Sequence, residues 1–114
     1  MANRRARNVK PQLSVILVNY NVREFLRNAL ASLQRALKGI PSELLVVDNA
    51  STDESAHMLR KEFPSVRLIA NPANAGFAFA NNQALRIARG EFFLLINPDT
   101  IVQENTIRTM LSFF

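Results

Sequence analysis

Short, mostly apolar runs alternate along this chain with longer segments whose apolar residues recur every three or four positions. The runs span residues 13–18, 44–47, 66–70 and 92–96 and are rich in branched and aromatic side chains. Runs of this kind are typical of strands buried on both faces of a parallel sheet. Helical spacing follows in the segments near 21–37, 51–63, 76–88 and 100–114. The order β-α-β-α-β-α-β-α predicts a doubly wound, mainly parallel α/β sheet with right-handed crossovers.

Three of the predicted helices begin at a capping-box pattern, in which a polar residue is followed three positions later by Glu or Gln. The pairs are Asn21 with Glu24, Ser51 with Glu54, and Thr100 with Gln103. Each pair is expected to bond reciprocally with backbone N–H groups in the first turn of its helix.

The apolar run at 92–96 stops at Asn97-Pro98-Asp99-Thr100. Pro98 has no N–H for a sheet ladder and disfavours a helical conformation at Asn97, so the strand should end there. We therefore expect the Asp99 carboxylate on a stiff turn just past the carboxyl end of a central strand. Open α/β sheets bind their ligands at that edge.

Polar residues also follow the first two strands. Asn19, Tyr20 and Asn21 end the first, and Asp48 and Asn49 end the second. The carboxyl ends of parallel strands meet at one edge, so these side chains should converge with the turn at 97–100. Ordinary turn and helix-cap use accounts for such residues one at a time. It accounts less well for an acid directly after a buried strand, which is desolvated unless it is paired or metal-bound.

The candidate chemistry at this edge is that of oxygen ligands. The chain has no cysteine and one histidine, His57, in a charged helical segment where a surface role is expected, so a zinc site is not predicted. Aspartate oxygens suit Mg²⁺ or Mn²⁺, and one carboxylate would need phosphate and water to complete the coordination. With three glycines in the chain and no Gly-rich loop after the first strand, a dinucleotide cradle is absent. A metal ion held by one carboxylate would take its other ligands from phosphate and water, so the sequence favours a diphosphate-bearing ligand that is held without a Gly-rich cradle.

The basic charge is concentrated at the N-terminus. Arg4, Arg5, Arg7 and Lys10 are four of the 14 basic residues, and no acid precedes Glu24. We expect residues 1–12 to form a flexible basic leader, with attraction to an anionic membrane surface as the alternative. The remaining body is nearly neutral, so nucleic acid is not expected as a partner. The absence of cysteine favours a cytoplasmic location, with peripheral contact at the inner face of a membrane as a variant.

Four segments in order are similar to a known family. They are 13–21 (LSVILVNYN), 46–53 (VVDNASTD), 74–82 (NAGFAFANN) and 94–100 (LLINPDT). The chain resembles the N-terminal, nucleotide-binding half of family 2 glycosyltransferases, in their rhamnosyltransferase-like branch. The resemblance implies the GT-A fold, which is Rossmann-like, and covers about residues 13–114.

The resemblance also implies a donor site. Asp48 would accept the N3–H of a uracil or thymine ring, and residues 18–21 would flank the base. Asn74 would line the diphosphate region, and Asp99 would reach the diphosphate through Mg²⁺ or Mn²⁺. The full implied set is Val18, Asn19, Tyr20, Asn21, Asp48, Asn49, Asn74, Gly76, Asn97 and Asp99.

Two departures from the family pattern matter. Asn97 replaces the first carboxylate of the Asp-x-Asp motif, which should weaken metal binding. Family members also continue for roughly another hundred residues, a size in line with larger single-domain α/β enzymes. We therefore expect the acceptor site and the general base beyond Phe114, and a fragment that binds donor without turnover. Its apolar end also favours self-association.

The implied function is an inverting glycosyltransferase that moves a sugar from dTDP-rhamnose or a UDP-sugar to a glycan or lipid-linked acceptor. Two alternatives stay open. A nucleotidyltransferase would be expected to have a Gly-rich loop after the first strand and a Lys or Arg residue near it, and residues 17–21 supply neither. A Mg²⁺-binding, receiver-like signalling module would use Asp48 as phosphoacceptor, but the first strand ends in Asn19 and Asn21 instead of an acidic pair.

Overall fold

A computed structural model describes residues 10–114 of the chain. Its element order is β1 (Leu13–Asn19), α2 (Arg23–Ala36), β2 (Ser42–Asp48), α3 (Ser55–Glu62), β3 (Arg67–Ala70), α4 (Phe77–Ile87), β4 (Phe92–Leu95) and α5 (Thr106–Leu111). The strands form a four-stranded sheet in the order β3-β2-β1-β4, and every pair is parallel. The predicted fold class is confirmed.

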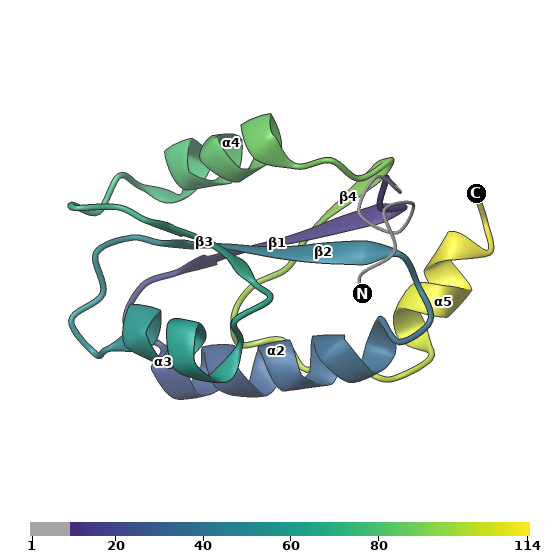
Figure 1. Ribbon diagram of the computed structural model, residues 1–114, viewed down its shortest axis with the longest axis horizontal. Helices are drawn as coiled ribbons and strands as arrows, with labels where there is room; N and C mark the ends of the chain where they lie inside the picture. Colours follow the sequence, from purple (N-terminus) through teal and green to yellow (C-terminus); the bar gives the residue numbers. More distant parts are fainter. Residues whose placement is uncertain (1–9) are drawn as a thin grey trace, which may run out of the picture.

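Helices cover both faces of the sheet. In Figure 1, α4 lies on one side, while α2 and α3 lie on the other. Alternation along β1 divides the core accordingly. Val15 and Leu17 face α2 and α3 in the larger apolar cluster, and Ile16 packs with Ala80 and Ala84 of α4. The sheet is therefore sandwiched between helical layers, and its carboxyl edge is left to the loops.

The prediction that 92–96 forms a central strand buried on both faces is wrong. The inner strands of the sheet are β2 and β1, and β4 lies at one edge. On the α4 side of β4, Phe93 and Leu95 are 48% and 47% exposed. The reason is that α4 packs over β1 and β2, so among residues 10–114 nothing covers that face of β4. An apolar run alone does not distinguish a central strand from an uncovered edge strand.

The three capping boxes are also wrong. The residue before α2 is Val22, and Asn21 has a left-handed φ of 54°. Helix α3 begins at Ser55, after Glu54 with a φ of 65°. Helix α5 begins at Thr106, not Thr100. In the described part of the chain, the N-cap residues of these helices, Val22, Glu54 and Asn105, make no side-chain cap bond.

The folded body begins earlier than residue 13. Pro11 is buried and its carbonyl accepts a hydrogen bond from the Glu91 N–H, while the Gln12 N–H bonds to the carbonyl of Pro41. Residues 11–12 therefore belong to the body. The prediction of a flexible or membrane-contacting leader at 1–9 lies outside the described residues.

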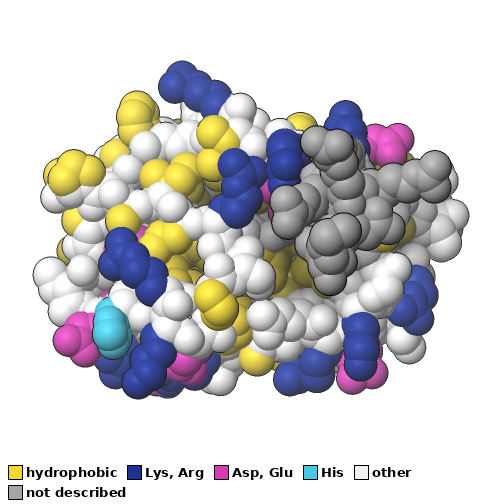
Figure 2. Space-filling model, in the orientation of Figure 1, with side chains coloured by type: hydrophobic (Ala, Val, Ile, Leu, Met, Phe, Trp, Pro, Cys, Tyr) yellow, Lys and Arg dark blue, Asp and Glu magenta, His cyan; other side chains and the backbone are white. Residues whose placement is uncertain are grey.

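Two surface features complete the picture. Figure 2 shows Lys and Arg side chains spread over this face of the molecule, with Asp and Glu among them. The imidazole of His57, cyan in the same view, is exposed, in agreement with the surface position predicted for it. Within residues 10–114, no helix combines the length and apolar character needed to cross a membrane.

Candidate functional site

An open groove of about 390 Å³ lies between the carboxyl ends of β1 and β4. Its lining residues are Val18, Tyr20, Val22, Phe25, Asn97, Pro98 and Asp99. Val18, Tyr20, Asn97 and Asp99 were all predicted as site residues, so the structure brings these four together around one cavity. Tyr20 is 50% exposed and presents its ring to the groove.

Asp48 ends β2, on the side of β1 away from β4, and is closed off by the protein. It is 3% exposed. Its Oδ1 accepts hydrogen bonds from Asn19 Nδ2 at 2.9 Å and from Ser51 Oγ at 2.6 Å, and its Oδ2 accepts from the Ser51 N–H at 3.1 Å. The desolvated acid is thus paired with protein donors. A contact between Asp48 and a ligand has to use the remaining capacity of Oδ2.

Ser51 and Asn21 join the loop after β1 to the loop after β2. Ser51 Oγ accepts from the Asn21 N–H at 2.9 Å, and Asn21 Oδ1 accepts from the Thr52 N–H at 2.7 Å. Tyr20 therefore lies between two residues, Asn19 and Asn21, that are both fixed to the β2 loop. This arrangement holds the backbone of an otherwise exposed aromatic residue.

Asn49 connects β1 to the loop before α4. Its N–H donates to the Asn19 carbonyl at 2.9 Å, and its side-chain Nδ2 donates to the Gly76 carbonyl at 3.2 Å. Its Oδ1 accepts from Asn71 Nδ2 at 2.9 Å, and Asn71 exchanges two amide hydrogen bonds with Gln83 of α4, at 2.8 and 2.9 Å. Asn49 is 2% exposed, so it acts from inside the protein.

Two predicted site residues, Asn74 and Gly76, lie in the loop before α4, and both are on the surface. Asn74 Oδ1 accepts from the Gly76 N–H at 2.9 Å, and both residues are exposed. Gly76 has a φ of +85°, which a residue with a Cβ adopts only under strain. This turn directs the chain into α4, next to Asn49.

The turn after β4 has a different character. The Ile96 N–H bonds to the Ile16 carbonyl at 2.9 Å, and the Thr100 N–H bonds to the Asn97 carbonyl at 3.1 Å. Asn97 and Asp99 are exposed, and no hydrogen bond from residues 10–114 reaches the oxygens of Asp99. The carboxylate stays available to a ligand.

The donor set at this turn suits a divalent cation that keeps other ligands. Within the described residues, no group of three or more His, Cys, Asp or Glu side chains could hold a metal ion. One free carboxylate, with the Asn97 amide two residues away, leaves most positions to phosphate oxygens and water. Mg²⁺ is commonly bound in this way, and Mn²⁺ shares its preference for oxygen ligands.

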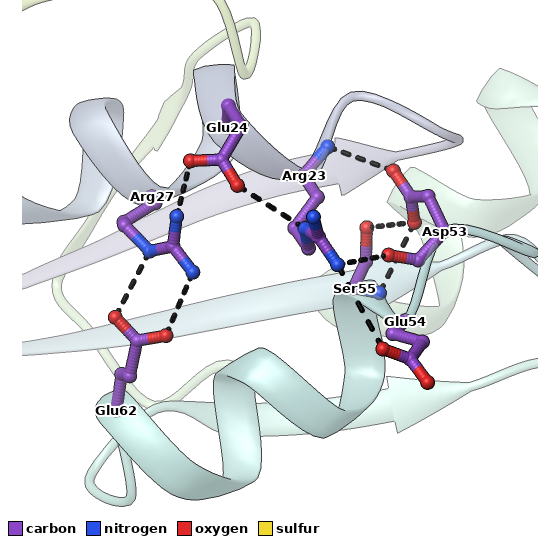
Figure 3. A network of polar contacts seen from close by, with 7 residues as sticks. All are labelled: Arg23, Glu24, Arg27, Asp53, Glu54, Ser55 and Glu62. Carbon is purple, nitrogen blue, oxygen red and sulfur yellow. Dashed lines mark hydrogen bonds and ion pairs between the residues drawn. The ribbon is translucent and has the colours of Figure 1, made fainter.

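Hydrogen bonds and ion pairs outside the groove join the first turns of α2 to the loop before α3 and to the end of α3 (Figure 3). The Arg23 N–H donates to Asp53 Oδ2 at 2.9 Å, and Arg27 bonds both oxygens of Glu62 at 2.9 and 2.8 Å. Partial burial acts to raise the pKa of Asp53, but hydrogen bonds from Ser55 and Arg23 outweigh it and lower that pKa. These contacts fix the loop after β1, which carries Tyr20, to the loop that follows Asp48 at the end of β2.

Sequence reasoning missed several residues of this edge. Ser51 was assigned to a helix cap, although its position three residues after Asp48 is the pattern of a side chain that closes a turn. Val22, Phe25 and Pro98 line the groove without having been predicted to do so. Phe25 lies in α2 beside the buried Leu26, and its 58% exposure distinguishes it from the core residues of that helix.

Comparison with known proteins gives a consistent result. A family profile described as Glycosyl transferase family 2 matches residues 14–114. The chain is 30% identical over 105 residues to the minor teichoic acid biosynthesis protein GgaB of Bacillus subtilis (strain 168), covering 89% of this chain and 12% of GgaB.

Two solved structures share the fold at similar identity. S. aureus TarS 1-349 in complex with UDP has a TM-score of 0.79 and 28% identity over 90% of this chain and 31% of that one. The mannosyltransferase PcManGT from Pyrobaculum calidifontis, in complex with GDP-Man and Mn²⁺, has a TM-score of 0.78 and 26% identity over 91% and 32%. The chain therefore spans about a third of the length of these two proteins.

Proposed function

Because the chain belongs to glycosyl transferase family 2, we propose that it is the nucleotide-sugar-binding part of an inverting glycosyltransferase. The donor would be dTDP-rhamnose or a UDP-sugar, and the acceptor a glycan or a lipid-linked sugar. The observation that carries the proposal is the groove that joins Tyr20 at the end of β1 to Asp99 after β4. An aromatic ring and a free carboxylate suit the two ends of a nucleoside diphosphate.

The comparisons support the ligand class. TarS was solved with UDP, and PcManGT with GDP-Man and Mn²⁺. GgaB is described as a teichoic acid biosynthesis protein, which agrees with a cell-wall or polysaccharide acceptor. Family membership also disfavours the nucleotidyltransferase and the receiver-like module.

The proposed roles follow the position of each residue. Residues 18–21 flank the base, and Tyr20 supplies its exposed ring. Asp48 accepts the N3–H of the base through the remaining lone pair of Oδ2 and also holds Asn19 and Ser51 in place. Asn74 and Gly76 border the ligand on the side of α4.

Asp99 and the Asn97 amide would hold Mg²⁺ or Mn²⁺ together with the diphosphate. When bound, the cation would neutralise the charge of the leaving nucleoside diphosphate. An inverting transfer also needs a base for the acceptor hydroxyl. We assign that role to none of residues 10–114, because Asp99 is the one acidic residue among those that line the groove.

Isothermal titration of the purified chain with UDP and dTDP, in Mn²⁺ and in EDTA, tests this proposal. The expected result is binding of at least one nucleotide, strengthened by Mn²⁺. A folded chain that binds neither nucleotide in either buffer would contradict the assignment of the site. CDP serves as the comparison nucleotide, because N3 of cytosine carries no hydrogen for Asp48 to accept.

A further inference from the structure

The loop that carries Asp99 is attached to the rest of the protein at few points. It runs from residue 96 to residue 105, between β4 and α5. At its start, the Ile96 N–H continues the pairing with β1 through the Ile16 carbonyl. In the described chain, a single hydrogen bond joins residues 97–105 to any element other than the adjacent α5. In that bond, the Val102 N–H donates to Ser32 Oγ at 3.0 Å.

Ser32 is unusual in its surroundings. It lies in the middle of α2, is 1% exposed, and is flanked on the buried face by Ala29 and Leu33. Its hydroxyl donates to the Ala29 carbonyl at 2.7 Å, which leaves its oxygen free to accept from Val102. A hydroxyl inside an apolar helix face stabilises the fold little by itself, and burial of one without partners is costly. Its evident use is as the acceptor for this loop.

We propose that Ser32 is a positioning residue for Asp99, and that it sets the metal-dependent part of nucleotide binding without touching the ligand. The proposal rests on the proposed function of the groove. Ile96 and Val102 are fixed on either side of the turn at 97–100, so their two bonds limit where the Asp99 carboxylate can lie. Loss of the Val102 bond leaves that end of the turn held by the apolar packing of Val102 against the core, which fixes its position less closely. A cation bridged between one carboxylate and a diphosphate depends on where that carboxylate lies, because Mg²⁺ requires near-ideal octahedral geometry.

Ser14 offers a matched control at the opposite end of the sheet. It is a buried serine, 0% exposed, whose hydroxyl donates to Glu43 at 2.6 Å and accepts from the Gly90 N–H at 2.8 Å. Gly90 lies two residues before β4, and the loop with Val102 follows that strand. Ser14→Ala therefore removes the same type of anchor from the same strand, on the side away from Asp99.

The experiment compares Ser32→Ala, Ser14→Ala and the unaltered chain by two measurements. Hydrogen–deuterium exchange reports on residues 97–105 without any ligand. Titration with UDP or dTDP gives the ratio of the affinity in Mn²⁺ to that in EDTA. For Ser32→Ala we expect faster exchange in 97–105 and a ratio lowered about five-fold, the effect of one hydrogen bond, with affinity in EDTA within about two-fold of the unaltered chain. Ser14→Ala should change neither the exchange of 97–105 nor the ratio.

The contrary outcomes are distinct. Unchanged exchange in 97–105, or an unchanged affinity ratio in Ser32→Ala, would overturn the positioning role while leaving the proposed function intact. An equal fall of the ratio in Ser14→Ala would assign the effect to general destabilisation and also overturn it. An unaltered chain that binds nucleotide without any Mn²⁺ effect would overturn the metal role of Asp99 and this inference together. If Ser32→Ala does not fold, Ser32→Cys keeps the volume and replaces the acceptor by a weak one.

Discussion

At the ends of β1 and β2, the polar side chains of the site are partnered inside the protein, whereas after β4 they face the groove. We call Asn19, Asn21, Asp48, Asn49, Ser51 and Asp53 the β2 side, and Asn97, Pro98 and Asp99 the β4 side. Asp48 is 3% exposed and has three protein donors. Asp99 is exposed and has none among residues 10–114.

The difference indicates a division of labour within one groove. A network whose central members, Asn19, Asp48 and Asn49, are buried and hydrogen-bonded to other protein groups is fixed before any ligand arrives, so it can present Tyr20 at no further cost in ordering. Within residues 10–114, Asn19 Oδ1 is the one buried side-chain oxygen of this network without a partner. An exposed carboxylate on a thinly attached loop gains its partners only when a ligand binds. The β2 side should therefore dominate stability, and the β4 side should dominate the metal dependence of binding.

The largest effect on stability is expected from Asp48→Ala. It leaves the Asn19 amide and the Ser51 hydroxyl without their shared acceptor in a buried site, which should lower the free energy of unfolding by about 3 kcal/mol. Urea denaturation measures the change. Asp48→Asn, which keeps one acceptor oxygen, should lose less. A loss below about 1 kcal/mol for Asp48→Ala would show that the hydrogen bonds of the β2 side do not dominate the stability of the protein.

A pair of asparagine variants separates the two sides more cleanly. Asn49→Ala removes the side-chain bonds to the Gly76 carbonyl and the Asn71 amide and should cost about 2 kcal/mol, because buried groups lose their partners. Asn97→Ala changes an exposed side chain and should stay within about 0.5 kcal/mol of the unaltered chain. Thermal unfolding followed by circular dichroism compares them. Equal melting temperatures would remove the distinction between the two sides.

A smaller effect is expected in acid. The pKa of Asp53 is lower in the folded protein than in the unfolded chain, despite the opposing effect of burial. Its contribution to stability is therefore complete above the unfolded pKa of about 3.9 and is lost as the pH falls through the folded value. Asp53→Asn should flatten the decline in unfolding free energy below about pH 5. Urea denaturation between pH 3 and pH 7 measures this, and an unchanged slope would contradict the assignment.

Much of the fold could be predicted from the sequence because its signals are local. Branched apolar runs such as Leu13–Val18 identified each strand, and the strand–helix alternation implied parallel pairing. The position of β4 could not be obtained in this way. Phe92–Ile96 is as apolar as a central strand, and whether a helix covers Phe93 depends on the packing of α4, which lies elsewhere in the sequence.

For the site, the sequence located residues but not their partners. Turn chemistry identified Asp48, Asn49 and Asp99, and parallel topology placed them at one edge. It did not show that Asp48 would be enclosed by Ser51, because the five polar residues in 48–53 can close a turn in several ways. It also could not reveal Ser32, whose partner is 70 residues away.

The most direct test of the division of labour is the Mn²⁺ dependence of nucleotide binding in Asp99→Ala. Glu104→Ala, which alters another exposed acid of the same loop, is the control. Isothermal titration with UDP or dTDP should give Asp99→Ala the affinity of the unaltered chain in EDTA and no gain in Mn²⁺, while Glu104→Ala keeps that gain. If Asp99→Ala still gains affinity in Mn²⁺, or loses affinity equally in both buffers, the β4 side is not the metal side of the groove.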